Sequence, residues 1–338
     1  MNQAKVLNFF GLLLIMFGMS FAIPLFVAIF YGESLIRVFG LGMSILVLIG
    51  FLSWFFTKDN KKELSLSDGF VITVLFWIVL SVSGSIPFIL FGFGVVDSFF
   101  ESMSGITTTG ATVIAGLDDL PKSLLIYRQL LQWLGGMGLI VLAIAVMPLL
   151  GIGGGQLFKT QTPGPMSEQR LTPRITSTAR ALWSIYFVLT VLCIFAYRLA
   201  GMNYFDAVSH AFSTVSIGGF STHDLSIGFF DSLSIEIVCI AFMLLSAMSF
   251  AVHYGAIYRK QVLKYFYDPE LRFFVSLLIA ILCLVCLSLF TNDIDDPIRS
   301  GLFQTVSILT TTGFLTDEYS SWPAYISFML LVGAFIGA

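Results

Sequence analysis

Charged residues are scarce in this sequence. Asp, Glu, Lys and Arg make up 11% of its 338 residues, whereas a soluble globular domain carries about 25%. Hydrophobic residues reach 57% and the mean hydropathy is +0.94, which excludes a soluble enzyme. Lys and Arg number 17 against 20 for Asp and Glu, so the chain lacks the basic excess that is typical of nucleic-acid binding. We therefore expect a membrane protein whose main solvent is lipid.

The residue types that build catalytic and metal centres are also few and lie without a pattern. All four cysteines fall inside apolar runs, where a thiol is more often a small core side chain than part of a disulfide or metal site. The three histidines do not form HExxH or another metal-ligand spacing. The GxSxG motif is absent and no Ser/His pair recurs at helical spacing, which argues against a membrane-embedded hydrolase. We expect that the protein is not an enzyme.

Long apolar runs dominate what is present. Seven of them approach the ~20 residues that a helix needs to cross a bilayer. They cover residues 7–31, 38–56, 70–91, 124–150, 181–199, 233–252 and 273–290. An eighth begins after Pro323 and is still apolar at Ala338. Because that last run is too short to span, we expect the chain to be truncated in mid-helix or completed by residues supplied elsewhere.

The distribution of positive charge predicts the orientation. With a cytoplasmic amino terminus, 12 of the 17 lysines and arginines lie in cytoplasmic segments and 5 in external ones, as the positive-inside rule requires. The acidic residues have the opposite bias, with 14 of the 20 outside. An outer vestibule rich in carboxylates attracts cations.

Three segments between successive runs are too polar for a span and too apolar for an ordinary loop. They read DSFFESMSGITTTGA from Asp97, DAVSHAFSTVSIGGF from Asp206 and SGLFQTVSILTTTGF from Ser300. Aligned without a gap, each begins with a residue type that caps helices and has a serine seven residues on and a glycine thirteen residues on. The same register places three polar residues in one column: Glu101, His210 and Gln304. We interpret the segments as internal repeats of span, short helix, glycine turn and span.

Each such segment is typical of a short re-entrant pore helix. Asp97, Asp206 and Ser300 would cap its outer end, and the helix dipole would leave partial negative charge at its carboxyl end, inside the bilayer. The TTTG or SIGG stretch that follows would be non-helical backbone at membrane depth, which is tolerated only where it lines a water-filled cavity. Its carbonyl oxygens can replace the hydration shell of a cation. The repeats therefore favour a cation pathway.

Three stretches carry a resemblance to a known family: FFESMSGITTTGATVIAGLDDLPKSLLIYRQLLQWLGGMGLIVLA, HAFSTVSIGGFSTHD and LFQTVSILTTTGF. They resemble the membrane subunit of the bacterial Trk potassium-uptake system, in the Trk/Ktr/HKT superfamily, and the resemblance extends over essentially the whole chain. It implies potassium uptake through a channel-like pore built from two leading helices and four span–pore helix–span repeats. It also implies one potassium filter strand per repeat. Here the strands would be Thr108, Thr109 and Gly110, then Ile217, Gly218 and Gly219, then Thr311, Thr312 and Gly313.

The resemblance also implies cofactors, partners and location. Potassium would be bound at the filter residues, with no covalent cofactor. The protein would be a homodimer in the bacterial inner membrane and would associate with a cytosolic nucleotide-binding regulatory subunit similar to TrkA. The connection from Lys159 to Arg180, with four basic residues and three prolines, is either a docking surface for that partner or an ordinary positive-inside loop.

The predicted organisation is an all-α polytopic membrane protein in four parts. Residues 1–63 form two leading transmembrane helices, 64–155 pore repeat 1, 156–260 a cytoplasmic connection and pore repeat 2, and 261–338 an incomplete pore repeat 3. The gating loop and fourth repeat of the family pattern are missing from the sequence. Since three quarters of a filter cannot enclose an ion, we expect that these 338 residues alone do not conduct selectively.

One alternative function stays open at this point. A proton- or sodium-coupled secondary carrier would be expected to have inverted repeats and paired carboxylates at the membrane midplane, whereas the three repeats here share one register and begin on the same side.

Two glutamates are functional candidates, because ionisable residues inside a membrane are costly. They are Glu101 within the first predicted pore helix and Glu236 near the outer end of a predicted span. Glu101 would tune the pore, while Glu236 would either do so or reach interfacial water.

Overall fold

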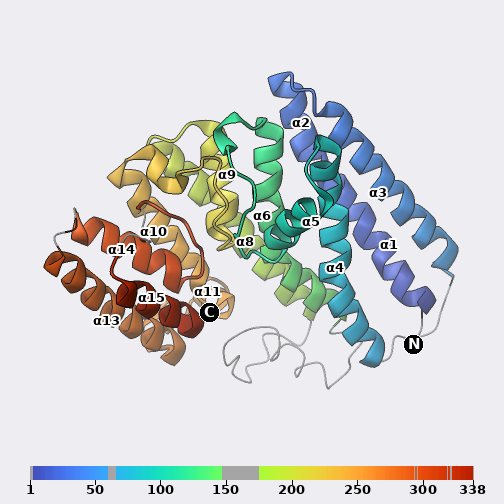
Figure 1. Ribbon diagram of the computed structural model, residues 1–338. Coiled ribbons are helices and arrows are strands. Elements are labelled where there is room, and N and C mark those ends of the chain that lie inside the picture. Colours follow the sequence, from blue (N-terminus) through green and yellow to red (C-terminus); the bar gives the residue numbers. More distant parts are fainter. Residues whose placement is uncertain are drawn as a thin grey trace. The chain divides into compact units, whose positions relative to one another are not determined.

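The computed structural model describes residues 3–59, 66–146, 175–292, 294, 296–317, 319 and 322–337. In this part of the chain every regular element is a helix and no strand occurs, which confirms the predicted all-α class. The chain forms two compact units, Met1–Gln161 and Thr162–Ala338, and each is described by itself (Figure 1). The predicted division of the chain into four parts stays a prediction.

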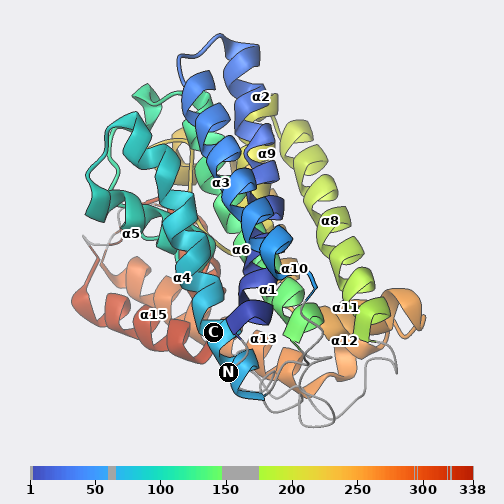
Figure 2. The same ribbon diagram turned by 90° about the vertical axis from the view of Figure 1, so that its right-hand side faces the viewer.

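The first unit holds the two leading segments and the first repeat. Its elements are α1 (Gln3–Ser20), α2 (Ala22–Tyr31), α3 (Ile36–Thr57), α4 (Leu66–Phe91), α5 (Val95–Ile106), the 3-10 helix η1 (Leu117–Asp119) and α6 (Lys122–Val146). Helix α1 lies along α3 (Figure 2), and α5 contacts both α4 and α6. The short helix α5 therefore packs against the two longer helices that precede and follow it.

An aromatic cluster joins the leading helices to the first repeat. The ring of Tyr127 on α6 lies 5.2, 5.4 and 5.3 Å from the rings of Phe21, Phe39 and Phe88. These rings come from the start of α2, from α3 and from α4, and all four are buried. The Tyr127 hydroxyl donates a hydrogen bond of 2.7 Å to the carbonyl of Gly84. Buried aromatic pairs of this kind add stability beyond the area they bury, so the cluster holds α4 and α6 against the leading helices.

The second unit repeats the same order twice. Its elements are α8 (Ile175–Leu199), α9 (Tyr204–Val215), the 3-10 helix η4 (Ser226–Phe230), α10 (Leu233–Ala247), α11 (Phe250–Tyr258), α12 (Lys264–Tyr267), α13 (Pro269–Thr291), α14 (Pro297–Leu309) and α15 (Ala324–Gly337). Helix α9 contacts α8 and α10, and α14 contacts α13 and α15, as α5 contacts α4 and α6. The predicted internal repeat is thus present three times in the described residues.

In the part of the chain that the structure describes, five helical segments are long and apolar enough to cross a membrane. They are Gln3–Tyr31, Ile36–Thr57, Ser67–Phe91, Arg180–Leu199 and Pro269–Thr291, and each matches a predicted span. Helix α6 follows the predicted span 124–150 as far as Val146, and residues 147–150 lie outside the described part.

The predicted span over 233–252 is not one continuous helix. Helix α10 ends at Ala247, and the helix that follows is bent away from it by 93°. The cause lies in the backbone of Met248, whose φ of −69° and ψ of 143° are extended. An extended residue cannot continue the helical ladder, so the apolar run becomes two helices.

The three short helices are too short to span. Helices α5 and α9 have 12 residues each and α14 has 13. At about 1.5 Å per residue they reach about 20 Å, whereas the hydrocarbon core of a bilayer is about 30 Å thick. This agrees with the predicted re-entrant helices. Of the predicted docking connection, residues 159–174 lie outside the described residues.

Candidate functional site

The short helices begin earlier than the sequence predicts. The predicted caps Asp97, Asp206 and Ser300 lie inside the helices, and the observed N-cap residues are Gly94, Asn203 and Asp296. Among these three, Asn203 uses its side chain, which accepts a hydrogen bond of 2.9 Å from the Asp206 N–H. In the third repeat Pro297 occupies the first turn, where its fixed φ suits the start of a helix. The cap assignment from sequence is therefore wrong by three or four residues.

At their carboxyl ends the three helices are alike. In each, a non-glycine residue adopts the left-handed conformation directly after the helix, with φ of 55° at Thr108, 55° at Ile217 and 59° at Thr311. The next N–H then bonds back to the carbonyl of the serine column. These bonds join Thr109 to Ser104 at 2.9 Å, Gly218 to Ser213 at 2.8 Å and Thr312 to Ser307 at 2.9 Å. This is the Schellman ending, which normally places glycine at the left-handed position.

The left-handed residues store strain where the predicted filter strands begin. A left-handed β-branched residue is a genuine outlier, and Thr108, Ile217 and Thr311 are all β-branched. Such conformations cost about 1–3 kcal/mol each and persist where the surrounding structure enforces them, often at ligand clamps. Two residues further on, the backbone is left-handed again, with φ of 78° at Gly110, 77° at Gly219 and 84° at Gly313. The three strands thus have left-handed residues at the same two columns. In sequence they agree at the glycine column and differ at the earlier one.

In the described residues, two of the predicted strands have backbone carbonyl oxygens that accept no hydrogen bond from a backbone N–H. Among the described residues, no backbone N–H donates to the carbonyl oxygens of Thr108–Gly110 or Thr311–Gly313. The carboxyl ends of α5 and α14, which carry the partial negative charge of the helix dipole, lie immediately before these strands. Both features suit a cation.

Two of the predicted strands come together in the second unit. A Cβ atom built on Gly219 would overlap the carbonyl oxygen of Thr312, so the strands of repeats 2 and 3 are in direct contact. Further along, the Gly228 N–H donates to the Leu315 carbonyl at 3.0 Å, and the Leu315 N–H donates to Ser226 Oγ at 3.1 Å. The strand of repeat 1 belongs to the first unit and is described by itself.

Three residues that share one column of the repeat alignment form hydrogen bonds to the segment that follows each predicted strand. They are Glu101, His210 and Gln304. All three side chains are fully buried. In repeat 2, His210 Nε2 lies 3.0 Å from Ser221 Oγ, and in repeat 3, Gln304 Nε2 donates to the Asp317 carbonyl at 3.0 Å. In each case a residue in the middle of the short helix binds the segment that follows the glycine of the predicted filter strand.

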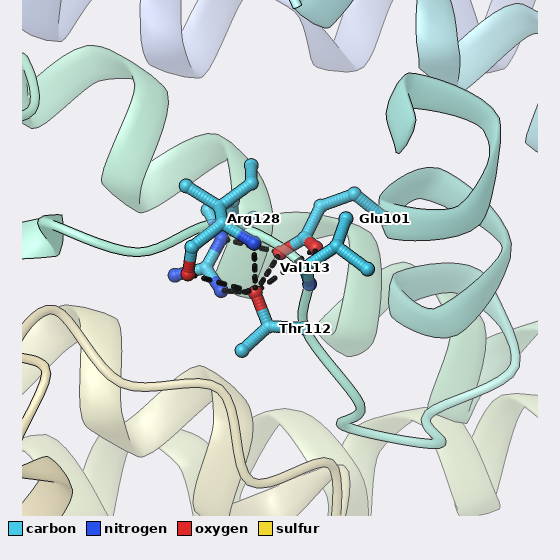
Figure 3. A network of polar contacts seen from close by, with 5 residues as sticks. Glu101, Thr112, Val113 and Arg128 are labelled. Carbon is cyan, nitrogen blue, oxygen red and sulfur yellow. Dashed lines mark hydrogen bonds and ion pairs between the residues drawn. The ribbon is translucent and has the colours of Figure 1, made fainter. Parts of the chain in front are cut away.

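In repeat 1 the same position carries a charged network (Figure 3). The Glu101 carboxylate accepts hydrogen bonds from Thr112 Oγ1 at 3.0 Å and from the Val113 N–H at 3.2 Å. Arg128 on α6 donates from Nε to Glu101 Oε1 at 2.7 Å and from Nη2 to Thr112 Oγ1 at 3.1 Å. Both charged side chains have 0% exposure.

Arg128 corrects the charge distribution that the sequence suggested. It is one of the five basic residues that the predicted orientation places in external segments, whereas its side chain is buried in α6. The signal that could have identified it is its position, since it lies within the apolar run 124–150 and an ionisable residue inside a membrane segment is a functional candidate by default.

Glu236 has a different setting. Its side chain is 4% exposed and accepts a hydrogen bond of 2.7 Å from Nη2 of Arg299, which also lies 3.0 Å from Asp231. Arg299 stands in the first turn of α14, and Glu236 stands in the first turn of α10. The ion pair therefore links the second span of repeat 2 to the pore helix of repeat 3.

The site offers no cluster of side chains for a divalent metal. Within the described residues, no group of three His, Cys, Asp or Glu side chains is placed to hold a metal ion. The oxygens available at the ends of the short helices are backbone carbonyls and threonine hydroxyls, such as the Thr107 and Thr109 pair, whose oxygens lie 2.8 Å apart. Such neutral oxygens are the ligands of monovalent-cation filters.

A family model described as TrkH, cation transport protein, matches residues 35–338. The chain belongs to the TrkH family. It is 47% identical over 343 residues to the Trk system potassium uptake protein TrkH of Halomonas elongata and 42% identical over 344 residues to that of Escherichia coli K12. Each alignment covers 100% of this chain and 71% of the relative.

The fold of this chain is also similar to that of a solved TrkH structure. The crystal structure of the potassium transporter TrkH from Vibrio parahaemolyticus matches with a TM-score of 0.88 and 44% identity, covering 99% of this chain and 70% of that one. With this membership and the apolar helices, the chain is a multi-pass membrane protein of a transport family rather than an enzyme. Membership of this family agrees with two properties predicted from the sequence, membrane spans and cation transport.

Proposed function

We propose that this protein takes up potassium ions through a channel-like pore with a backbone-carbonyl filter. The filter strands would be Thr108–Gly110, Ile217–Gly219 and Thr311–Gly313, and potassium would be bound by their carbonyl oxygens. The observation that carries the proposal is the left-handed backbone repeated at the same two columns of all three strands. The names of the relatives, which are potassium uptake proteins, support potassium as the ion.

The carbonyl oxygens would act by replacing water around the ion. A cation that enters such a filter loses hydration oxygens and gains carbonyl oxygens, and selectivity depends on their number, field and spacing. The glycine of each strand has no Cβ, so the backbone can approach the ion closely. The negative ends of the α5, α9 and α14 dipoles favour a cation over an anion.

We extend the proposal to location and partners. The protein would lie in the bacterial inner membrane with a cytoplasmic amino terminus, which the bias of lysine and arginine supports. It would form a homodimer and bind a cytosolic nucleotide-binding regulatory subunit similar to TrkA, as the resemblance to the Trk system implies. Potassium is the transported ion in this proposal, and no covalent cofactor takes part.

Growth on limiting potassium tests the proposal. The protein, expressed from its natural gene, should restore growth to a bacterial strain that lacks its own potassium uptake systems, while the empty vector should not. Direct uptake of rubidium or potassium by the same cells should rise in parallel. Restored growth on an organic solute, with no gain on limiting potassium, would instead indicate the proton- or sodium-coupled carrier and overturn the proposal.

A further inference from the structure

We propose that Arg128, Glu101 and Thr112 form a positioning network for the first filter strand, and that discrimination between potassium and sodium depends on it. The inference rests on the proposed function, because it assumes that Thr108–Gly110 is a filter strand. It adds residues that touch no ion and act through the strand. The network lies wholly within the first unit.

Thr112 is the centre of the network. It follows Gly110 by two residues, and its hydroxyl bonds to the Glu101 carboxylate and to Arg128 Nη2. It also accepts a hydrogen bond of 3.1 Å from the Ile114 N–H. One hydroxyl therefore connects the strand to α5 through Glu101 and to α6 through Arg128.

The two charges make this connection rigid. Glu101 and Arg128 are both fully buried, and a buried charge that loses its partner is strongly destabilised, so neither side chain can turn away without cost. The planar guanidinium donates from Nε to Glu101 and from Nη2 to Thr112. This fork has a fixed geometry that a lysine ammonium does not reproduce. The strand is thus held at a defined distance from both helices.

The other repeats hold their strands with different chemistry. His210 reaches Ser221 through an imidazole, and Gln304 reaches Asp317 through an amide. The first repeat uses an ion pair at the same column. Since a filter of this type selects by the spacing of its oxygens, a shift of the strand at Thr112 would change that spacing at Gly110.

The test compares two substitutions at Thr112 in the protein expressed from its natural gene. Thr112→Val removes the hydroxyl and keeps the shape, while Thr112→Ser keeps the hydroxyl. We expect Thr112→Val to lower the ratio of potassium to sodium uptake by about two- to tenfold, the effect of losing an ordinary hydrogen bond, and Thr112→Ser to keep it. A control is Thr73→Val, because the Thr73 hydroxyl bonds to the Gly69 carbonyl within its own helix α4.

Arg128→Lys gives a second measurement that preserves the buried charge. It should lower the same ratio while the amount of protein in the membrane stays near that of the unchanged protein, because the ion pair remains and the fork is lost. Gly110→Ser serves as the reference for the filter itself. If Gly110→Ser lowers the ratio and neither Thr112→Val nor Arg128→Lys does, the network inference is overturned and the proposed filter stands. If all three leave the ratio unchanged, the filter assignment fails as well.

Discussion

At the scale of single residues, two glycines of the proposed filter differ in what surrounds them, and this gives a matched pair of substitutions. Gly313 has φ of 84° and open space where a Cβ would stand, whereas a Cβ on Gly219, with φ of 77°, would overlap the Thr312 carbonyl. Alanine at either position bears the left-handed strain of about 1–2 kcal/mol. Gly219→Ala adds the overlap, so it should destabilise the protein more than Gly313→Ala.

The thermal unfolding midpoint of the purified protein in detergent measures the difference. We expect a modest decrease of the midpoint for Gly313→Ala. Gly219→Ala should lower the midpoint more and should also abolish potassium uptake. Equal midpoints for the two variants would mean that the strands of repeats 2 and 3 are not in contact at Gly219.

The glycine column could be predicted from sequence, while the left-handed residues two positions earlier could not. Glycine is the residue that adopts positive φ freely, so a glycine shared by three aligned segments indicates a turn. Thr108, Ile217 and Thr311 are β-branched and disfavour it. Their conformation is imposed by the helix ending and by packing, which a sequence pattern does not contain.

At the scale of elements, the start of α9 depends on its N-cap. Asn203 accepts a hydrogen bond from the Asp206 N–H through its side chain, and loss of such a cap costs about 0.5–2 kcal/mol. Asn203→Ala should therefore lower the free energy of unfolding by about that amount, and Asn203→Ser, which keeps an acceptor, should lower it less. Thermal unfolding checks both variants, and a neutral Asn203→Ala would argue against the cap.

The sequence located the short helices but misplaced their first turns. Asp97, Asp206 and Ser300 are cap-type residues, yet the helices begin at residues before them because Gly94, Asn203 and Pro297 also favour a helix start. The break at Met248 was invisible for a similar reason. The run 233–252 is mostly apolar on both sides of Met248, and hydropathy alone does not report a local change of backbone.

At the scale of the whole molecule, the orientation in the membrane is a prediction that labelling can check. In a background without its four cysteines, Asp119→Cys should react with a membrane-impermeant thiol reagent in intact cells. Lys58→Cys should react after the membrane is permeabilised and not before. Both positions are exposed in the first unit. The reverse pattern would place the amino terminus outside and contradict the positive-inside argument.

The buried ion pair of Glu101 and Arg128 could not be predicted from the sequence. Glu101 was a candidate because it stands inside a pore helix, but its partner Arg128 lies 27 residues away on another helix. Nothing in the spacing of the two residues predicts their contact, which arises from the packing of α5 on α6. Membership of the TrkH family supplied the class of function, and the fold supplied the contact.

The most direct test of the central claim is the ratio of potassium to sodium uptake, under matched gradients, for Gly110→Ser in the protein expressed from its natural gene. A serine there adds a Cβ to a residue with φ of 78° in the proposed filter, so the ratio should fall. Thr107→Ser is the control, because it keeps the hydroxyl that donates to the Met103 carbonyl at 2.7 Å, and its effect should be milder. An unchanged ratio for Gly110→Ser, with total flux preserved, would mean that the glycine is a turn residue and that the filter lies elsewhere.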